Sequence, residues 1–186
     1  MRSWWSSSLP SSYGAADAFG RLYPKQLVSL GLPDRLDPVV WFGGLGVITF
    51  AIGALALRIV EARINGVGVA RRVYAAACGS GALGVLLLAA APDAVIGSAG
   101  VLLVAGIAWS VTRAVGAIWV NSRASSDVRA TVQSFLAQVE YLGEILCGIA
   151  LGILAQVTSI SGALAGACVL VVCAGVVVAR SDADHR

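Results

Sequence analysis

Five long apolar runs constrain this chain more than any other feature, because each is close to the roughly 20 residues that a helix needs to cross a bilayer. An unpaired backbone polar group is costly in hydrocarbon, so runs of this length without turn signals predict helices. The sequence therefore predicts an all-α membrane protein with five transmembrane helices. The runs are Val39 to Leu57, Val73 to Ala91, Ala94 to Thr112 with a helical extension to Val120, Ala130 to Gln156, and Ile160 to Ala179.

The composition excludes several other classes of protein. Hydrophobic residues make up 58% of the chain and charged residues 12%, whereas about a quarter of a soluble domain is charged. The arginines are scattered between apolar runs and form no continuous basic face, so we predict no nucleic-acid partner. The four cysteines lie inside apolar runs without the spacing of metal ligands. No enzyme motif, metal site or cofactor site is evident.

The distribution of arginines predicts the topology. The turns at 92–93 and 157–159 carry no Lys or Arg, whereas the connections after the first and third runs are basic. The positive-inside rule places these basic connections and the C-terminus in the cytoplasm, as in a multi-pass protein of the cell membrane. The bases before the first span would then lie outside, which indicates a preceding span. The segment Gly14 to Leu30 is too short and too charged to provide it.

One stretch carries a family resemblance. WVNSRASSDVRATVQSFLAQVEYLGEILCGIALG, from Trp119 to Gly152, resembles the cytoplasmic loop and eleventh helix of major facilitator superfamily transporters. The stretch DAFGRLYPKQLVSLGLP is similar to the end of the seventh helix in drug-efflux-like members, except that Gly20 stands where an acid is expected. The resemblance implies that the five spans correspond to helices eight to twelve of a twelve-helix carrier.

On this interpretation, the chain has three parts. Residues 1–38 are a remnant of a preceding helix and its outer loop, residues 39–180 are a five-span bundle, and residues 181–186 are a cytoplasmic tail. The resemblance implies efflux of a small-molecule solute by alternating access between two six-helix halves. A partner chain or an oligomer would then supply the missing helices. The alternative is a small integral-membrane structural or assembly subunit without transport activity of its own.

Two acids in the fourth run are the sharpest candidates for chemistry. Glu140 and Glu144 are four residues apart, and Gln133 and Tyr141 belong to the same polar stripe, which we expect to face the bundle interior. A carboxyl that gains and loses a proton inside a membrane can couple solute movement to a proton gradient. In the alternative interpretation, the glutamates hydrogen-bond to neighbouring helices or lie at a wetter level near the cytoplasmic entrance.

The third run offers a second candidate site. Trp109 and Arg113, with Ser110 and Thr112 between them, form a mixture that can line a cavity for an amphipathic solute, and Arg113 can extend to the cytoplasmic surface. Packing near the inner surface is the alternative.

Two GxxxG pairs, Gly148 with Gly152 and Gly162 with Gly166, predict close helix packing. The sequence leaves open whether this packing occurs within one chain or between two.

Overall fold

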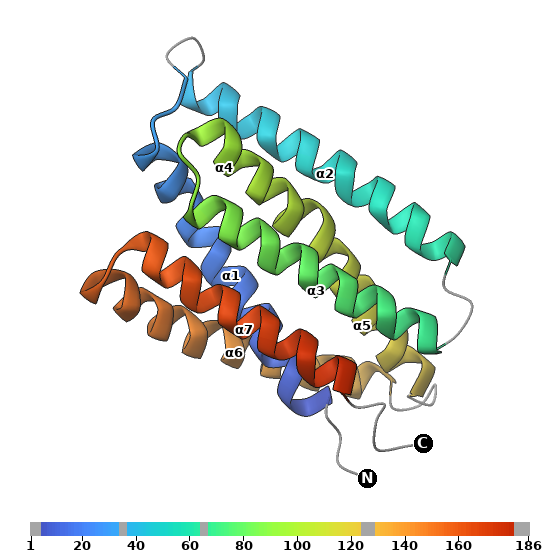
Figure 1. Ribbon diagram of the computed structural model, residues 1–186. Helices are drawn as coiled ribbons and strands as arrows, with labels where there is room; N and C mark the ends of the chain where they lie inside the picture. The colour runs from blue at the N-terminus through green and yellow to red at the C-terminus, as the bar shows by residue number, and fades with distance from the viewer. Residues whose placement is uncertain (1–4, 34–36, 64–66, 124–128, 181–186) are drawn as a thin grey trace.

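The computed structural model describes residues 5–33, 37–63, 67–123 and 129–180, and every regular element in these ranges is a helix. The predicted tail, residues 181–186, lies outside the described residues. The third predicted span is one continuous rod built from α4, η1 and α5 (Figure 1). The elements are α1 (Trp5–Ser29), α2 (Pro38–Arg63), α3 (Val67–Ala89), α4 (Ala94–Val101), η1 (Leu102–Trp109), α5 (Ser110–Arg123), α6 (Arg129–Val157) and α7 (Ile160–Arg180).

All five predicted spans are helices, which confirms the all-α membrane class. Among the described residues, four helices are long and apolar enough to cross a membrane, and the apolar part of α7 is somewhat shorter. The observed bounds extend beyond the predicted runs by at most six residues, mainly where arginines and small residues continue a helix past its apolar part. Hydropathy locates the part of a helix that lies in lipid, not the last hydrogen-bonded turn.

The N-terminal segment contains a longer helix than the stretch Gly14 to Leu30. Trp5–Ser29 forms one continuous helix of 25 residues, α1, which begins well before Gly14. Phe19 and Leu27 of α1 are fully buried in the main hydrophobic core. The helix runs behind α3 and α7 along the length of the bundle (Figure 1). It is thus an integral part of the packing despite its polar residues.

The helices pack with α3 in the middle of the bundle. One flank of α3 lies against α7 and the other against the α4–η1–α5 rod, while α2 and α6 occupy the two edges (Figure 1). The largest core cluster joins α1, α2, α3, α4, η1 and α7. Its buried members include Phe19, Leu27, Val85, Leu88, Val101 and Leu164.

Glycines set the closest approach between α3 and α4. A Cβ added to Gly84 would lie 2.6 Å from the Gly100 carbonyl oxygen, and one added to Gly100 would lie 2.5 Å from the Gly84 carbonyl oxygen. Only glycine lets two backbones approach this closely, which is how small residues drive helix association in membranes. The α3–α4 hairpin therefore depends on both glycines.

The third span contains a π-helical segment, η1, which the sequence did not predict. It lies where α2 crosses the rod: a Cβ on Gly53 would lie 2.7 Å from Ser110 Oγ, and one on Gly106 would lie 3.0 Å from Ile52 Cγ2. Ser110 Oγ donates to the Ala105 carbonyl at 3.5 Å. A π-turn widens the helix and leaves its carbonyls less regularly paired, so a hydroxyl donor at its end compensates part of that loss.

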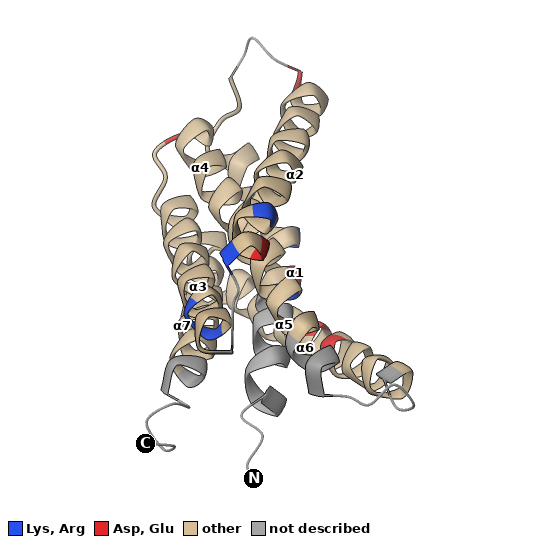
Figure 2. Ribbon diagram, turned by 90° about the vertical axis from the view of Figure 1, so that its right-hand side faces the viewer, with Lys and Arg blue, Asp and Glu red and all other residues tan. Residues whose placement is uncertain are grey.

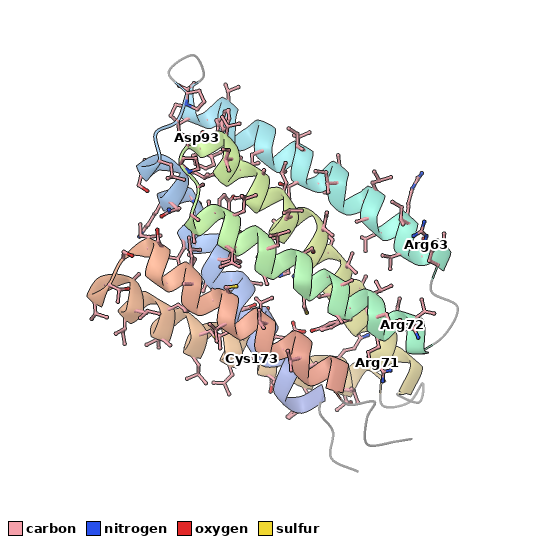
Figure 3. All side chains as sticks on the ribbon, in the orientation of Figure 1. Arg63, Arg71, Arg72, Asp93 and Cys173 are labelled. Atoms are coloured by element: carbon pink, nitrogen blue, oxygen red, sulfur yellow. The ribbon has the colours of Figure 1, made fainter. Side chains whose placement is uncertain are left out.

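The two ends of the bundle differ in charge. Arg63, Arg71 and Arg72 lie at one end, and Asp93 lies at the other (Figure 3). Asp93 caps α4, since its Oδ1 accepts a hydrogen bond from the Ile96 N–H at 2.9 Å. Arg63, Arg71 and Arg72, which flank the first connection, thus lie together at one end of the bundle.

We predict that Gly84→Ala lowers the free energy of unfolding by about 1–3 kcal/mol, the usual cost of overpacking, because its methyl group would displace the α4 backbone. Unfolding in mixed micelles with increasing denaturing detergent measures the change. Gly79→Ala is the matched control on the same helix, since nothing lies within 4 Å of a Cβ there. Equal effects of the two substitutions would contradict the assigned α3–α4 contact.

Candidate functional site

The two glutamates of α6 lie within the span, on the face of the helix that meets the bundle. Both side chains are half-buried. Leu151 follows Glu144 by seven residues on the same face, and it is buried together with Ala18 of α1 and Ala167 of α7. Figure 2 shows the acidic residues of α6 within the helix. The pair therefore points towards the region between α1 and α7.

The other two members of the predicted stripe do not join the glutamates in the interior. Tyr141 is 64% exposed, and Gln133 is also exposed. Tyr141 is adjacent in sequence to Glu140, so its side chain is rotated by about 100° around the helix, away from the buried face. The interior part of the stripe is thus limited to Glu140 and Glu144.

An ion pair lies on α1, the helix that packs against α6. Arg21 Nε lies 2.9 Å from Asp17 Oδ2, and the two side chains are 76% and 28% exposed. Their spacing of four residues, which brings side chains together on a helix, is visible in the sequence. The sequence reasoning missed the pair because it took this segment for a remnant and an outer loop.

Trp109 lies at the end of η1, against α1. A Cβ added to Gly20 would lie 3.7 Å from Cη2 of the indole ring. Gly20, which stands where the family resemblance expects an acid, therefore packs against Trp109. Trp109 and Thr112 also line a small apolar cavity of about 40 Å³ that is partly open to the surface. The remaining lining residues come from α1, α3, η1 and α7: Ala16, Cys78, Gly81, Val85, Val104, Ala108, Ala167 and Val171.

The cavity has room for about one water molecule, so it does not hold an amphipathic solute in this conformation. The Thr112 hydroxyl donates to the Ala108 carbonyl at 2.8 Å, and this bond turns it back onto its own helix. Arg113 is exposed. The structure thus separates the two candidates of the third span, with Trp109 inside the bundle and Arg113 at its surface.

A buried polar contact joins α1 to α7. Gln26 is 6% exposed, and its Nε2 donates to Ser161 Oγ at 3.3 Å. Side chains of this type hydrogen-bond across helices in membranes, where no water can replace the partner. The contact fixes the position of α1 near the end of the bundle that carries Asp93.

Comparison of the chain with protein-family models, with curated proteins and with solved structures finds no match. The resemblance to major facilitator transporters therefore stays a prediction from the residues that carry it.

We predict that Gln26→Leu and Ser161→Ala each destabilise the protein and that their effects are not additive. The expected coupling free energy is about 0.6 kcal/mol, the average for interhelical hydrogen bonds in membrane proteins. A double-mutant cycle of unfolding in mixed micelles measures it. Strictly additive effects would show that the bond contributes nothing to the packing of α1.

Proposed function

We propose that the chain is the C-terminal portion of a carrier like those of the major facilitator superfamily, which exports a small molecule in exchange for protons. The observation that carries the proposal is the half-buried pair Glu140 and Glu144 inside a membrane span. Ionisable side chains at this depth are costly, and they usually mark a solute or proton pathway. The similarity of Trp119 to Gly152 to the family's eleventh helix supports the same function.

The coupling works through desolvation. A carboxyl that faces the closed bundle favours its protonated, neutral form, and the same carboxyl releases its proton when an aqueous cavity opens beside it. Alternation between these two environments exchanges a proton for a solute across the bilayer. Glu140 and Glu144 carry the proton in this proposal. Another six-helix half moves against this bundle and thereby opens and closes the aqueous cavity beside the two carboxyls.

The proposed orientation in the cell membrane follows from the charges at the two ends of the bundle. Arg63, Arg71 and Arg72 share an end, which the positive-inside rule assigns to the cytoplasm together with the C-terminus. Asp93 then faces the exterior. The start of α1 lies at the same end of the bundle as the end of α7 (Figure 1). If α1 also crosses the membrane, the charge conflict of a five-span topology is reduced, because of the bases before α2 only Lys25 and Arg35 come at or after its outer end.

We predict that a membrane-impermeant maleimide added to intact cells labels Asp93→Cys but not Arg63→Cys. Both side chains are exposed at opposite ends of the bundle, so each reports one side of the membrane. Permeabilised cells should label both variants, which provides the control for reactivity. Labelling of Arg63→Cys in intact cells would reverse the proposed orientation.

We predict that Glu140→Gln and Glu144→Gln each abolish proton-coupled efflux, because glutamine mimics the protonated acid permanently. The measurement uses everted vesicles that contain the chain with any partner helices it requires. Respiration establishes a pH gradient, and amphipathic cations are added one by one. A transported cation should discharge the gradient with the native chain and not with either variant.

Glu61→Gln is the matched control, since Glu61 is exposed near the basic end of α2. It removes one acid without changing the interior pair, so discharge should persist. Full discharge with Glu140→Gln or Glu144→Gln would remove that residue from the proton pathway. Absence of discharge by any cation with the native chain would count against proton-coupled efflux of this solute class.

One observation favours the second candidate, a structural or assembly subunit. The spans of α2 and α6 are each only 11% buried, against 44% for α3, so two helices have most of their surface available for other proteins. Stable co-purification with a different membrane protein, with no proton-coupled efflux from the complex, would favour this function.

A further inference from the structure

The edge helix α2 diverges from α4 towards the Asp93 end of the bundle. Its close contact with the third span lies deeper, at η1, where a Cβ added to Gly53 would lie 3.2 Å from the Gly106 carbonyl oxygen. Above this crossing the two helices separate (Figure 2). The space between them is a groove of about 450 Å³, which is within the usual size of a ligand site. We name it the α2–α4 groove.

Two facing helix stripes line the α2–α4 groove. One stripe lies in residues 40–48 of α2, and the other lies in residues 95–102 of α4 and η1. Leu45 and Ser98 are each 7% exposed and form the floor, whereas Val95 is 58% exposed and lies at the rim. The Ser98 hydroxyl donates to a carbonyl of its own helix, four residues earlier, at 2.7 Å. The floor is therefore suited to an apolar occupant.

The groove extends from one end of the bundle to about the middle of the span. Trp41 and Ile48 are three and ten residues after the start of α2, which places them about 5 and 15 Å from that end. On the other wall, Leu102 is eight residues after the start of α4, or about 12 Å. Since the hydrocarbon core is about 30 Å thick, the groove covers the depth of one leaflet.

This depth distinguishes between two kinds of occupant. The window of α2 that can cross the membrane is only 11% buried, so the groove opens towards lipid. A transmembrane helix of another protein would extend through both leaflets, but the groove closes where α2 crosses η1 at Gly53 and Gly106. The acyl chain of a phospholipid ends near the middle of the bilayer. The shape of the groove therefore fits an acyl chain better than a partner helix.

Trp41 places a hydrogen-bond donor at the upper end of the groove. Its Nε1 is buried and has no hydrogen-bond partner in the described part of the chain. The indole N–H of a buried tryptophan usually has a partner, and tryptophan rings in membranes lie at the headgroup level, where the ester carbonyls of glycerophospholipids also lie. The ring is half-buried and lines the groove, so a rotation of the ring brings its N–H to such a carbonyl.

Two carboxylates flank the mouth of the groove. Asp37 and Asp93 directly precede α2 and α4, and both are exposed. Figure 2 shows acidic residues at the starts of these two helices. Neither 37–48 nor 93–102 contains a lysine or an arginine. Charge complementarity at this mouth favours a headgroup that carries an amine over one that is only anionic.

We propose that the α2–α4 groove binds one glycerophospholipid with an amine-bearing headgroup. One acyl chain lies between α2 and α4, an ester carbonyl accepts a hydrogen bond from Trp41 Nε1, and the ammonium group lies near Asp37 and Asp93. This site does not depend on the proposed transport activity.

Mass spectrometry of the intact, delipidated chain in mild detergent tests the site when phosphatidylethanolamine is titrated into it. One lipid per chain should be retained, with a higher affinity than phosphatidylglycerol of the same acyl chains. Retention of no phospholipid, or tighter binding of phosphatidylglycerol, would overturn the proposal.

A pair of neighbouring glycines provides a matched comparison. Nothing lies within 4 Å of a Cβ added to Gly44 or Gly43, but only Gly44 lines the groove. Gly44→Leu should therefore fill the groove without a clash at its Cβ and lose the retained lipid. Gly43→Leu should retain it. Equal behaviour of the two variants would show that the lipid binds elsewhere.

The hydrogen bond to Trp41 is tested with an ether-linked lipid that has the same headgroup and chains but no ester carbonyl. The native chain should bind the ester lipid about 2–10-fold more tightly than the ether lipid, the usual effect of one net hydrogen bond. Trp41→Phe should bring this ratio to about one. Its binding of the ether lipid shows that the variant is folded. An unchanged ratio in Trp41→Phe would overturn the assigned contact.

Discussion

Backbone hydrogen bonding governs this structure, because a peptide N–H or C=O that lacks a partner in hydrocarbon costs several kcal/mol. Helices satisfy this requirement within each segment, so the chain reaches the bilayer as a set of rods whose interiors are complete. The remaining question is how the rods associate when lipid is as apolar as their side chains. In the described part of the chain, the answer is mostly close approach at glycines, with a few polar side chains where helices cross.

The glycine contacts explain why α3 lies in the middle. Gly84 lets α3 approach α4 closely. A Cβ added to Gly81 of α3 would lie 3.0 Å from the Cβ of Ala108 in η1, and one added to Gly175 of α7 would lie 3.0 Å from the Cβ of Cys78 in α3. Each contact replaces side-chain volume with backbone proximity, which increases dispersion attraction over a long interface. By comparison, α2 and α6 use fewer of their small residues within the chain.

The sequence predicted the spans because hydropathy and length are properties of each segment alone. It did not predict that α1 packs along the bundle, since the burial of Phe19 and Leu27 depends on surfaces supplied by α3, α4 and α7. The π-helical segment was also unpredictable, because its conformation is coupled to the crossing with Gly53 of α2. The helical period placed Glu140 and Glu144 on a common face. It could not show that Tyr141 lies outside, because the angular width of the buried face is set by neighbouring helices.

The turns at the Asp93 end have a consequence for how the chain enters a membrane. Asp93 caps α4, and at the α6–α7 turn Thr158 Oγ1 donates to the Leu154 carbonyl at 2.6 Å while Ser159 Oγ accepts from the Gly162 N–H at 3.0 Å. These local bonds satisfy part of the backbone polarity at each turn, and neither turn carries a cation. Each helical hairpin is therefore suited to cross the bilayer as one unit during biosynthesis, tip first, before the rest of the protein has assembled around it.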